Sequence, residues 1–406
     1  MAGRFTKQQW DKIEAELLRD PEGYGMPVGP REESMVLASF NIRKLGKVKN
    51  RERELAFMAR FCARCDLVAI QEVQDSLDGL RHLKKQVDER VASEGEFGLV
   101  VSDITGEVPG EKGMAERLAF LYRKSRVRRM DMASDLSIDR SGVLNNFSKK
   151  ADDFSAAWKK YNNALKKFQQ TKKGKKPKLE LPAFLTFTRT PFVSAFEVPA
   201  TGDGEPLLFI AVNTHLVYGT MKDRKEEFKA LVSWLTARLK KESKMVAPNF
   251  ILLGDLNLDL DKPEKDRPVI ENFIRSLNKK TFGDANARHI YFPFIGDHPR
   301  TGKPIRTNAR LNQTFDQIAF FLGKQEKRLP NDIWWKEIVK DSPDTFDCGV
   351  FNFADLFAKV IKGKSFEKMT KAEVKGLGKH FEHSVSDHMP IWVRIPRPGF
   401  RPPPRG

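Results

Sequence analysis

Short apolar runs alternate with helix-spaced apolar residues along most of the chain. Nine runs have the length of a strand, at residues 35–42, 66–73, 97–101, 117–122, 192–198, 207–214, 250–256, 314–321 and 389–395. Most of them are unbroken rather than alternating, which is typical of strands covered on both faces. Helical spacing recurs in residues 51–64, 77–93, 222–241 and 265–278. We therefore expect an α/β sandwich of two sheets with helices outside.

The N-terminal segment, residues 1–30, predicts a small helical extension. Thr6 and Gln9 have the spacing of a capping box, and apolar residues recur at three and four positions through residues 6–20. The prolines and glycines that follow end the helix. We expect this extension to pack on one large domain that spans residues 31–396.

A lysine-rich segment interrupts this domain at about residues 130–185. Its central part, residues 148–180, holds eleven lysines and a stripe of apolar residues at helical spacing. We expect the stripe to pack on the body of the protein and the lysine run 171–178 to form a loop. Such a segment can hold a nucleic-acid backbone, because lysines bind phosphates as point charges, or it can be a solvated charge run. The proline-rich residues 397–406 predict a disordered tail.

The charge composition of the chain indicates a possible class of binding partner. The 406 residues include 72 Lys and Arg against 54 Asp and Glu, a formal net charge of +18. A strongly positive field attracts polyanions, so nucleic acid is a candidate partner, although charge alone is as compatible with a merely basic protein.

Cys62, Cys65 and Cys348 are too few for a disulfide framework and lack companions for a zinc site. No apolar run is long enough to span a membrane and no signal sequence is evident, so we expect a cytoplasmic protein without membrane contact.

Polar residues interrupt the apolar runs where strands end. They are Asn41, Glu72, His215, Asp255, Asn257, Asp316, Asp387 and His388. A buried charge needs a partner or a cation, so one such residue predicts only a local hydrogen bond. Several at the ends of different strands can meet at one rim, where α/β folds place their sites. Carboxylate and amide oxygens suit Mg²⁺ or Mn²⁺, and histidines paired with carboxylates can move a proton. The set indicates metal-assisted hydrolysis of a phosphate ester.

Eight segments, in order, resemble the endonuclease/exonuclease/phosphatase superfamily, whose type member is pancreatic deoxyribonuclease I. They are SFNIRKLG (39–46), DLVAIQEVQDS (66–76), ERLAFLYR (116–123), RTPFVSAF (189–196), NTHL (213–216), LLGDLNLD (252–259), TFDQIAF (314–320) and SDHMPI (386–391). The resemblance implies a four-layer sandwich of two mixed β-sheets flanked by helices. It also implies a metal-dependent phosphodiester hydrolase. Within that class we expect a nuclease, most simply an endonuclease that acts on DNA rather than RNA.

The resemblance assigns roles to single residues. The metal ligands that it implies, for Mg²⁺ or Mn²⁺, are Asn41, Glu72 and Asp387. The catalytic residues that it implies are His215, Asp255, Asn257, His388, Asp316 and Glu116. Those that contact the substrate phosphates are Arg43 and Arg189. In this scheme Asp255 orients the attacking water and Asn257 positions the phosphate, while Glu116 and Asp316 fix the tautomers of the two histidines. It leaves open which histidine is the general base and whether one or two ions take part.

Two positions depart from deoxyribonuclease I. Gln74 stands where that enzyme has an arginine in the minor groove, and Met114 where it has a stacking tyrosine. Identical double-strand cutting is therefore not implied. Two other functions stay open: hydrolysis of a phosphoester outside nucleic acids, and binding of nucleic acid without cutting. Retention of every Glu, His and Asp position in the motifs favours an enzyme.

Overall fold

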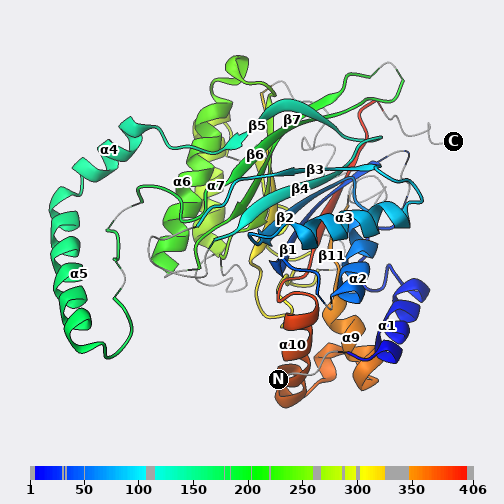
Figure 1. Ribbon diagram of the computed structural model, residues 1–406. Coiled ribbons are helices and arrows are strands. Elements are labelled where there is room, and N and C mark those ends of the chain that lie inside the picture. The colour runs from blue at the N-terminus through cyan, green and yellow to red at the C-terminus, as the bar shows by residue number, and fades with distance from the viewer. Residues whose placement is uncertain are drawn as a thin grey trace.

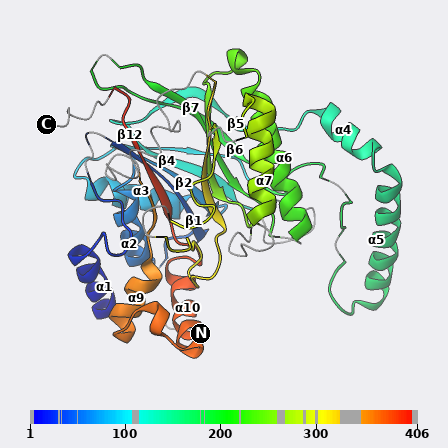
Figure 2. The ribbon, with the colours of Figure 1, turned by 180° about the vertical axis from the view of Figure 1, so that it is seen from behind.

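The computed structural model describes most of the chain. The described residues are 5–29, 32, 34–49, 51–106, 115–177, 179–182, 184–202, 204–218, 221–258, 267–285, 289–298, 302–324 and 347–399. Within these ranges two six-stranded sheets pack face to face, and helices cover their outer faces (Figure 1; Figure 2). The predicted sandwich of two mixed sheets flanked by helices is confirmed.

Each sheet combines parallel and antiparallel pairs. The first sheet has the order β11-β12-β1-β2-β4-β3 and the second β5-β6-β7-β8-β10-β9. The strands of the first are β1 (Ser34–Leu45), β2 (Leu67–Val73), β3 (Phe97–Val101), β4 (Arg117–Arg123), β11 (Asp347–Val350) and β12 (Ile391–Pro396). Those of the second are β5 (Arg128–Asp135), β6 (Phe192–Val198), β7 (Leu207–His215), β8 (Asn249–Asp255), β9 (Ile290–Tyr291) and β10 (Asp316–Phe321). The parallel pairs, β1 with β2 and β7 with β8, lie inside their sheets.

The helices divide between the two outer faces. The first sheet is covered by α1 (Lys7–Arg19), α2 (Glu52–Cys62), α3 (Asp78–Arg90), α9 (Phe353–Lys362) and α10 (Lys371–Ser384). The second is covered by α6 (Met221–Leu239) and α7 (Arg267–Phe282). Two short 3₁₀ turns occur at Glu242–Lys244 and Phe366–Lys368. None of the described helices is both long and apolar enough to cross a membrane.

The unbroken apolar strands are buried on both faces, as their pattern predicts. In β1, Met35 and Leu37 pack between the two sheets, whereas Val36 and Ala38 pack under the helices. Successive side chains of a strand point to opposite faces, so each such strand contributes to two layers of core. A further apolar layer lies between the second sheet and its helices. Cys62, Cys65 and Cys348 are buried within these layers, and burial raises the pKa of the Cys62 thiol to about 12.

The N-terminal helix α1 begins with the predicted capping box. The Thr6 hydroxyl accepts a hydrogen bond from the Gln9 amide at 3.2 Å, and the Gln9 side chain accepts one from the Thr6 amide at 2.8 Å. Trp10 and the other apolar residues on the inner face of the helix are buried, and Trp10 packs edge-on against Phe357 of α9. Helix α1 is therefore part of the core on the first sheet.

The lysine-rich segment forms α4 (Arg140–Ser148) and α5 (Ala151–Thr171), which project away from the sandwich (Figure 1; Figure 2). Our expectation that its apolar stripe packs on the body is wrong. Of the residues of α5, all of which are described, Phe154 alone is buried, and its ring lies 4.9 Å from that of Phe147 in α4. Trp158 is 56% exposed. The two helices therefore pack on each other rather than on a sheet.

The carboxylate of Glu16 in α1 is in contact with three neighbouring polar side chains. It accepts hydrogen bonds from Arg19 and Tyr24, both at 2.6 Å, and lies 3.0 Å from the Lys359 ammonium of α9. These contacts lower the pKa of Glu16 to about 2 from its ordinary 4.5.

Glu16→Gln is expected to lower the free energy of unfolding by about 1 kcal/mol near neutral pH. Because the folded-state pKa lies below the unfolded one, the stabilisation is complete above about pH 5 and is lost as the pH falls through 2. Urea unfolding across this range measures the difference between variant and wild type. The exposed Glu22→Gln is the control, and a difference that stayed constant down to pH 2 would contradict the assignment.

Candidate active site

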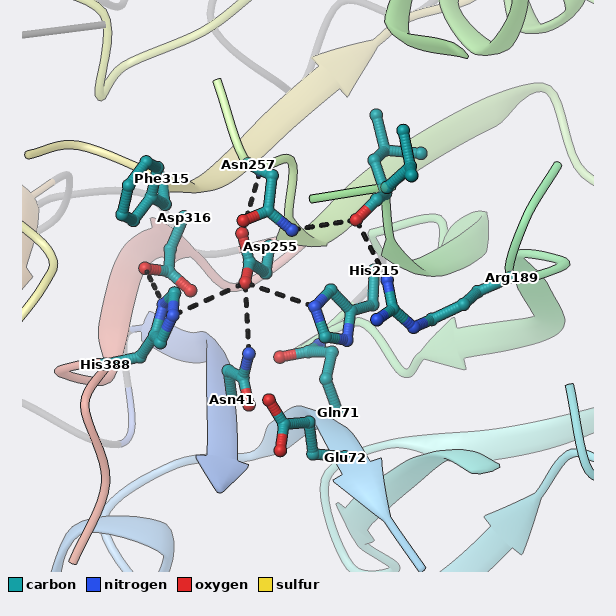
Figure 3. Close-up of polar contacts among 12 residues, drawn as sticks. Asn41, Gln71, Glu72, Arg189, His215, Asp255, Asn257, Phe315, Asp316 and His388 are labelled. Atoms are coloured by element: carbon teal, nitrogen blue, oxygen red, sulfur yellow. Dashed lines mark hydrogen bonds and ion pairs between the residues drawn. The ribbon is translucent and has the colours of Figure 1, made fainter. Parts of the chain in front are cut away.

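Three side chains from neighbouring strands form a row across the second sheet. In register, His215 of β7 lies beside Asp255 of β8, and Asp255 lies beside Asp316 of β10. Directly paired residues point to the same face of a sheet. This face is turned toward the first sheet, where Asn41 of β1 lies opposite (Figure 3).

The fully buried carboxylate of Asp255 is the centre of the cluster. Its Oδ2 accepts a hydrogen bond from Asn41 Nδ2 at 3.0 Å and lies 3.5 Å from Nε2 of both His215 and His388 (Figure 3). Its Oδ1 accepts a hydrogen bond from the backbone amide of Asn257 at 2.8 Å. One carboxylate is thus shared by groups from both sheets.

Each histidine is held from behind by a second carboxylate. His215 Nδ1 lies 2.7 Å from Oε1 of Glu116, and His388 Nδ1 lies 2.9 Å from Oδ2 of Asp316. These contacts turn both Nε2 atoms toward Asp255. The structure therefore brings together the two histidine–carboxylate pairs that the motifs imply.

The buried charges raise the pKa values of both histidines and lower that of Asp255. Burial by itself lowers the pKa of His388, but the carboxylates of Asp316 and Asp255 outweigh it and raise that pKa well above its ordinary value. Burial also opposes the carboxylate of Glu116 at His215, whose pKa is raised on balance. Burial would raise the pKa of Asp255, but the two imidazoles and the Asn257 amide lower it. Each histidine of the cluster is therefore protonated more readily than a free imidazole.

The oxygen atoms beside this cluster fit a hard cation. Oδ1 of Asn41 and Oδ1 of Asp387 are buried without a hydrogen-bond partner. Glu72 is half-buried next to Asn41, and one of its oxygens accepts a hydrogen bond from the Lys44 amide at 3.1 Å (Figure 3). Unpartnered amide and carboxylate oxygens are the donor set of Mg²⁺ or Mn²⁺.

A second group of possible ligands overlaps the cluster around Asp255. One ligand atom from each of Asp255, Asp316 and His388 lies within 4.8 Å of the others. Asp316 also has an unpartnered buried oxygen, Oδ1. A divalent ion therefore has two adjacent sets of donors.

The two arginines occupy different environments. Arg189 is buried, with its Nε 3.3 Å from Oε2 of Glu116 and its Nη1 donating to the Leu216 carbonyl at 3.1 Å. Its contacts fix Glu116, the partner of His215. Arg43 is partly exposed and lies 3.5 Å from Asp387. Of the two guanidinium groups, that of Arg43 is the more accessible to a substrate.

The backbone around the site adopts conformations that few residues tolerate. Glu72 and Asn257 have positive φ angles of 58° and 49°. Asparagine adopts this left-handed region readily, but glutamate does so at a cost of order 1–3 kcal/mol, which is typical of functional sites. Gly254, directly before Asp255, has φ 153°, and an added Cβ would lie 1.9 Å from the Thr214 carbonyl oxygen.

Several positioning residues were not predicted from the sequence. Gln71 Nε2 donates to Asn213 Oδ1 at 2.7 Å, and Asn213 Nδ2 donates to the Ile70 and Ala119 carbonyls of the opposite sheet. Ser386 Oγ donates to the Asn41 carbonyl at 2.7 Å. Gln71 and Asn213 are polar residues inside otherwise apolar strands, one position from Glu72 and two from His215, and this pattern was the available signal.

The structure describes one of the two positions that depart from deoxyribonuclease I. Gln74 is half-buried behind Glu72, and its Nε2 donates to the Glu72 carbonyl at 3.4 Å. Met114 lies outside the described residues.

Comparisons with known proteins give likenesses in structure. No family model matches the chain, and no curated protein matches it. The human Nocturnin catalytic domain with bound sulfate is 10% identical, with a TM-score of 0.45 over 92% of this chain and 97% of that one. D. rerio TDP2, complexed with a single-strand DNA product, is 14% identical, with a TM-score of 0.41 over 89% and 98%. ANGEL2, a 2',3'-cyclic phosphatase in complex with adenosine-2',3'-vanadate, is 10% identical, with a TM-score of 0.46 over 91% and 97%.

Sequence identities and TM-scores this low do not indicate which reaction this chain catalyses or which substrate it binds. The two mixed sheets and the ordered motif segments are observations on this chain itself. The eight ordered motif segments resemble the endonuclease/exonuclease/phosphatase superfamily, and two mixed sheets are the fold that this resemblance implies. Its chemistry has to be inferred from the geometry of the site.

Gly254→Ala tests whether close packing next to Asp255 is required. We expect the new methyl group to displace the Thr214 carbonyl or Asp255 itself, and to lower the free energy of unfolding by about 1–3 kcal/mol. Gly283→Ala is the matched control, because Gly283 also has a positive φ, 87°, but its added Cβ meets nothing within 4 Å. Urea unfolding compares the two variants, and equal decreases in stability would show that the close approach plays no part.

Proposed function

We propose that this protein is a divalent-metal-dependent phosphodiester hydrolase, and specifically an endonuclease that cuts DNA. One observation carries the proposal: the buried carboxylate of Asp255 lies between two histidines, each backed by its own carboxylate. Unpartnered oxygens of Asn41 and Asp387 lie alongside. This combination provides a base, two acids and a cation site within one cluster, as hydrolysis of a phosphodiester requires.

The roles follow from the charges. Asn41, Glu72 and Asp387 would hold Mg²⁺ or Mn²⁺, whose chemistry when bound is to neutralise charge on the phosphate oxygens. Asp255 accepts a hydrogen bond from the attacking water and orients it, because its lowered pKa keeps it ionised. The raised pKa values of His215 and His388 allow either to stabilise the pentacoordinate transition state or to protonate the leaving oxygen. Asn257, whose Nδ2 donates to the Leu216 carbonyl at 2.8 Å, positions the phosphate.

Nucleic acid is the substrate class that the charge distribution favours. The net charge is +18, and exposed lysines lie along the projecting helix α5. Trp158 and Tyr161 expose ring surface on the same helix, with their centroids 5.9 Å apart. Lysines contact phosphates and aromatic rings stack on bases, so residues 148–180 are proposed as the nucleic-acid contact. Three free, buried cysteines fit a reducing compartment, and we propose the cytoplasm.

His215→Ala tests the reaction. With Mg²⁺ or Mn²⁺ the wild type is expected to nick supercoiled plasmid, and chelator abolishes this nicking. The variant is expected to cut about 10²–10⁴-fold more slowly, the usual contribution of an acid–base group. His289→Ala is the control, because that ring stacks on Phe282 rather than on the catalytic cluster.

Equal nicking by His215→Ala and wild type would refute the assigned site. A folded wild-type protein that cleaved no plasmid in either metal would refute DNA as the substrate. RNA and small phosphoesters would then be assayed with the same pair of proteins, and inactivity on all of them would favour a binding protein.

Replacing Lys159, Lys160, Lys166 and Lys167 by Gln tests the proposed DNA-binding surface on α5. All four are exposed. We expect weaker DNA binding and a salt slope reduced by about 0.9 for each phosphate that these lysines neutralise in the wild type. The control removes the same charge from the body, at Lys240, Lys241, Lys279 and Lys280, which are also exposed. Titrations of labelled duplex at several salt concentrations measure both slopes, and identical slopes for the two variants would refute a special role for α5.

A further inference from the structure

An open cleft of about 590 Å³ lies among α1, α2 and α3 on the outer side of the first sheet. Figure 1 shows these three helices on the same side of that sheet. The residues that line the cleft are Leu17, Leu18, Pro21, Met26, Arg60, Ala63, Arg64, Arg90, Val91 and Arg123. Four of them are arginines, and none of the described residues that line it is acidic. Its volume falls in the range of small-molecule sites, about 300–1,000 Å³.

Backbone carbonyls accept hydrogen bonds from three of these arginines. Arg90 donates to the Ala56 carbonyl through Nε and Nη2, at 3.2 and 2.7 Å. Arg64 donates to the Pro27 carbonyl at 3.3 Å, and Arg123 to the Ala63 carbonyl at 2.7 Å. Carbonyl groups orient a guanidinium without cancelling its charge. The cleft is therefore positively charged and built of oriented donors.

Carboxylates compensate this charge only in part. Arg60 forms an ion pair with Glu14 at 2.7 Å. Asp66 is shared between Arg123, at 3.5 Å, and Arg126, at 2.8 Å. Glu14 and Glu89 also raise the pKa of Arg90, so carboxylates lie around the cleft, although none of its described lining residues is acidic.

The guanidinium groups that line the cleft also repel one another. Burial and the nearby Arg60 guanidinium lower the pKa of Arg90. A bound anion would relieve this repulsion, and guanidinium groups bind planar or tetrahedral oxyanions with several donors at once.

The other wall of the cleft is apolar. Leu17 and Met26 are buried at its base, whereas Leu18 is 60% exposed at its edge. Val91, at the end of α3, completes this wall. A fully hydrated inorganic ion would leave these side chains in water, so the shape favours an anion that also carries an apolar group.

The cleft is separate from the candidate active site. Arg123 lies beside the start of β2, where its amide donates to the Asp66 carbonyl, whereas Glu72 lies near the other end of that strand. At about 3.3 Å per residue, β2 separates the two by roughly 20 Å. Binding here does not depend on the proposed hydrolysis.

We propose that this cleft is a binding site for a small organic anion, with a phosphate, sulfonate or carboxylate group on the arginines and an apolar group against Leu17, Leu18 and Met26. Arg90 is its principal anion contact. Leu18 sets its preference for ligands with an apolar part.

The test uses anilinonaphthalene sulfonate, a fluorescent aromatic sulfonate, titrated into the full chain. Arg90→Gln is expected to weaken binding at least about tenfold, the effect of removing one charged hydrogen bond. Arg81→Gln is the matched control, because Arg81 lies on the same helix but is exposed and does not line the cleft. Thermal unfolding of each variant confirms that the fold is retained. Unchanged binding in Arg90→Gln, or equal weakening in both variants, would overturn the proposal.

A second variant leaves the arginines intact. Leu18→Asp places a carboxylate at the exposed edge of the cleft, where it does not disturb the core. We expect it to weaken binding of the aromatic sulfonate about tenfold or more, because it removes apolar surface and adds a repulsive charge. Sulfonate binding that was unaffected by Leu18→Asp would overturn the site even if Arg90→Gln did not fold.

Discussion

The fully buried carboxylate of Asp255 is the constraint on which the candidate site depends. Burying such a charge alone costs several kcal/mol, so the fold must supply its counter-charges. The partners of Asp255 come from both halves of the molecule: Asn41 donates a hydrogen bond from the first sheet, and the imidazole of His215 lies beside the carboxylate from the second. His388, just before β12, closes the remaining side. The sheets can neutralise Asp255 only when they are packed in the observed register, so packing of the sheets also assembles the candidate site.

A second polar contact reinforces that register. The side-chain amides of Gln71 and Asn213 meet between the sheets and satisfy each other and two backbone carbonyls. Apolar side chains elsewhere in this layer constrain distance more than position, because the hydrophobic effect has no direction. Hydrogen bonds between buried amides do have direction, and shifting one sheet against the other would leave them unpaired. The pair therefore specifies how the sheets align.

Much of this structure could be predicted from the sequence, and the failures have physical causes. The long apolar strands and the polar residues at their ends were predictable, because burial on both faces leaves a continuous apolar run. Strand β5 was not, since its residues are largely exposed at a sheet edge, and β9 and β11 are only 2 and 4 residues long. The amphipathic pattern of α5 identified an apolar face but not what covers it. The buried position of Arg189 behind Glu116 depends on the packing of distant segments, which no local pattern encodes.

The place of β12 in the first sheet bears on how the protein is made. This strand pairs with β1 on one side and β11 on the other, and its preceding turn ties Ser386 to Asn41, 345 residues apart in sequence. During synthesis β1 emerges early and keeps one edge unpaired until β12 leaves the ribosome. At about 5–20 residues per second, that interval lasts tens of seconds. An unpaired apolar edge is a site for wrong pairing, so the edge of β1 is open to such pairing until β12 is complete.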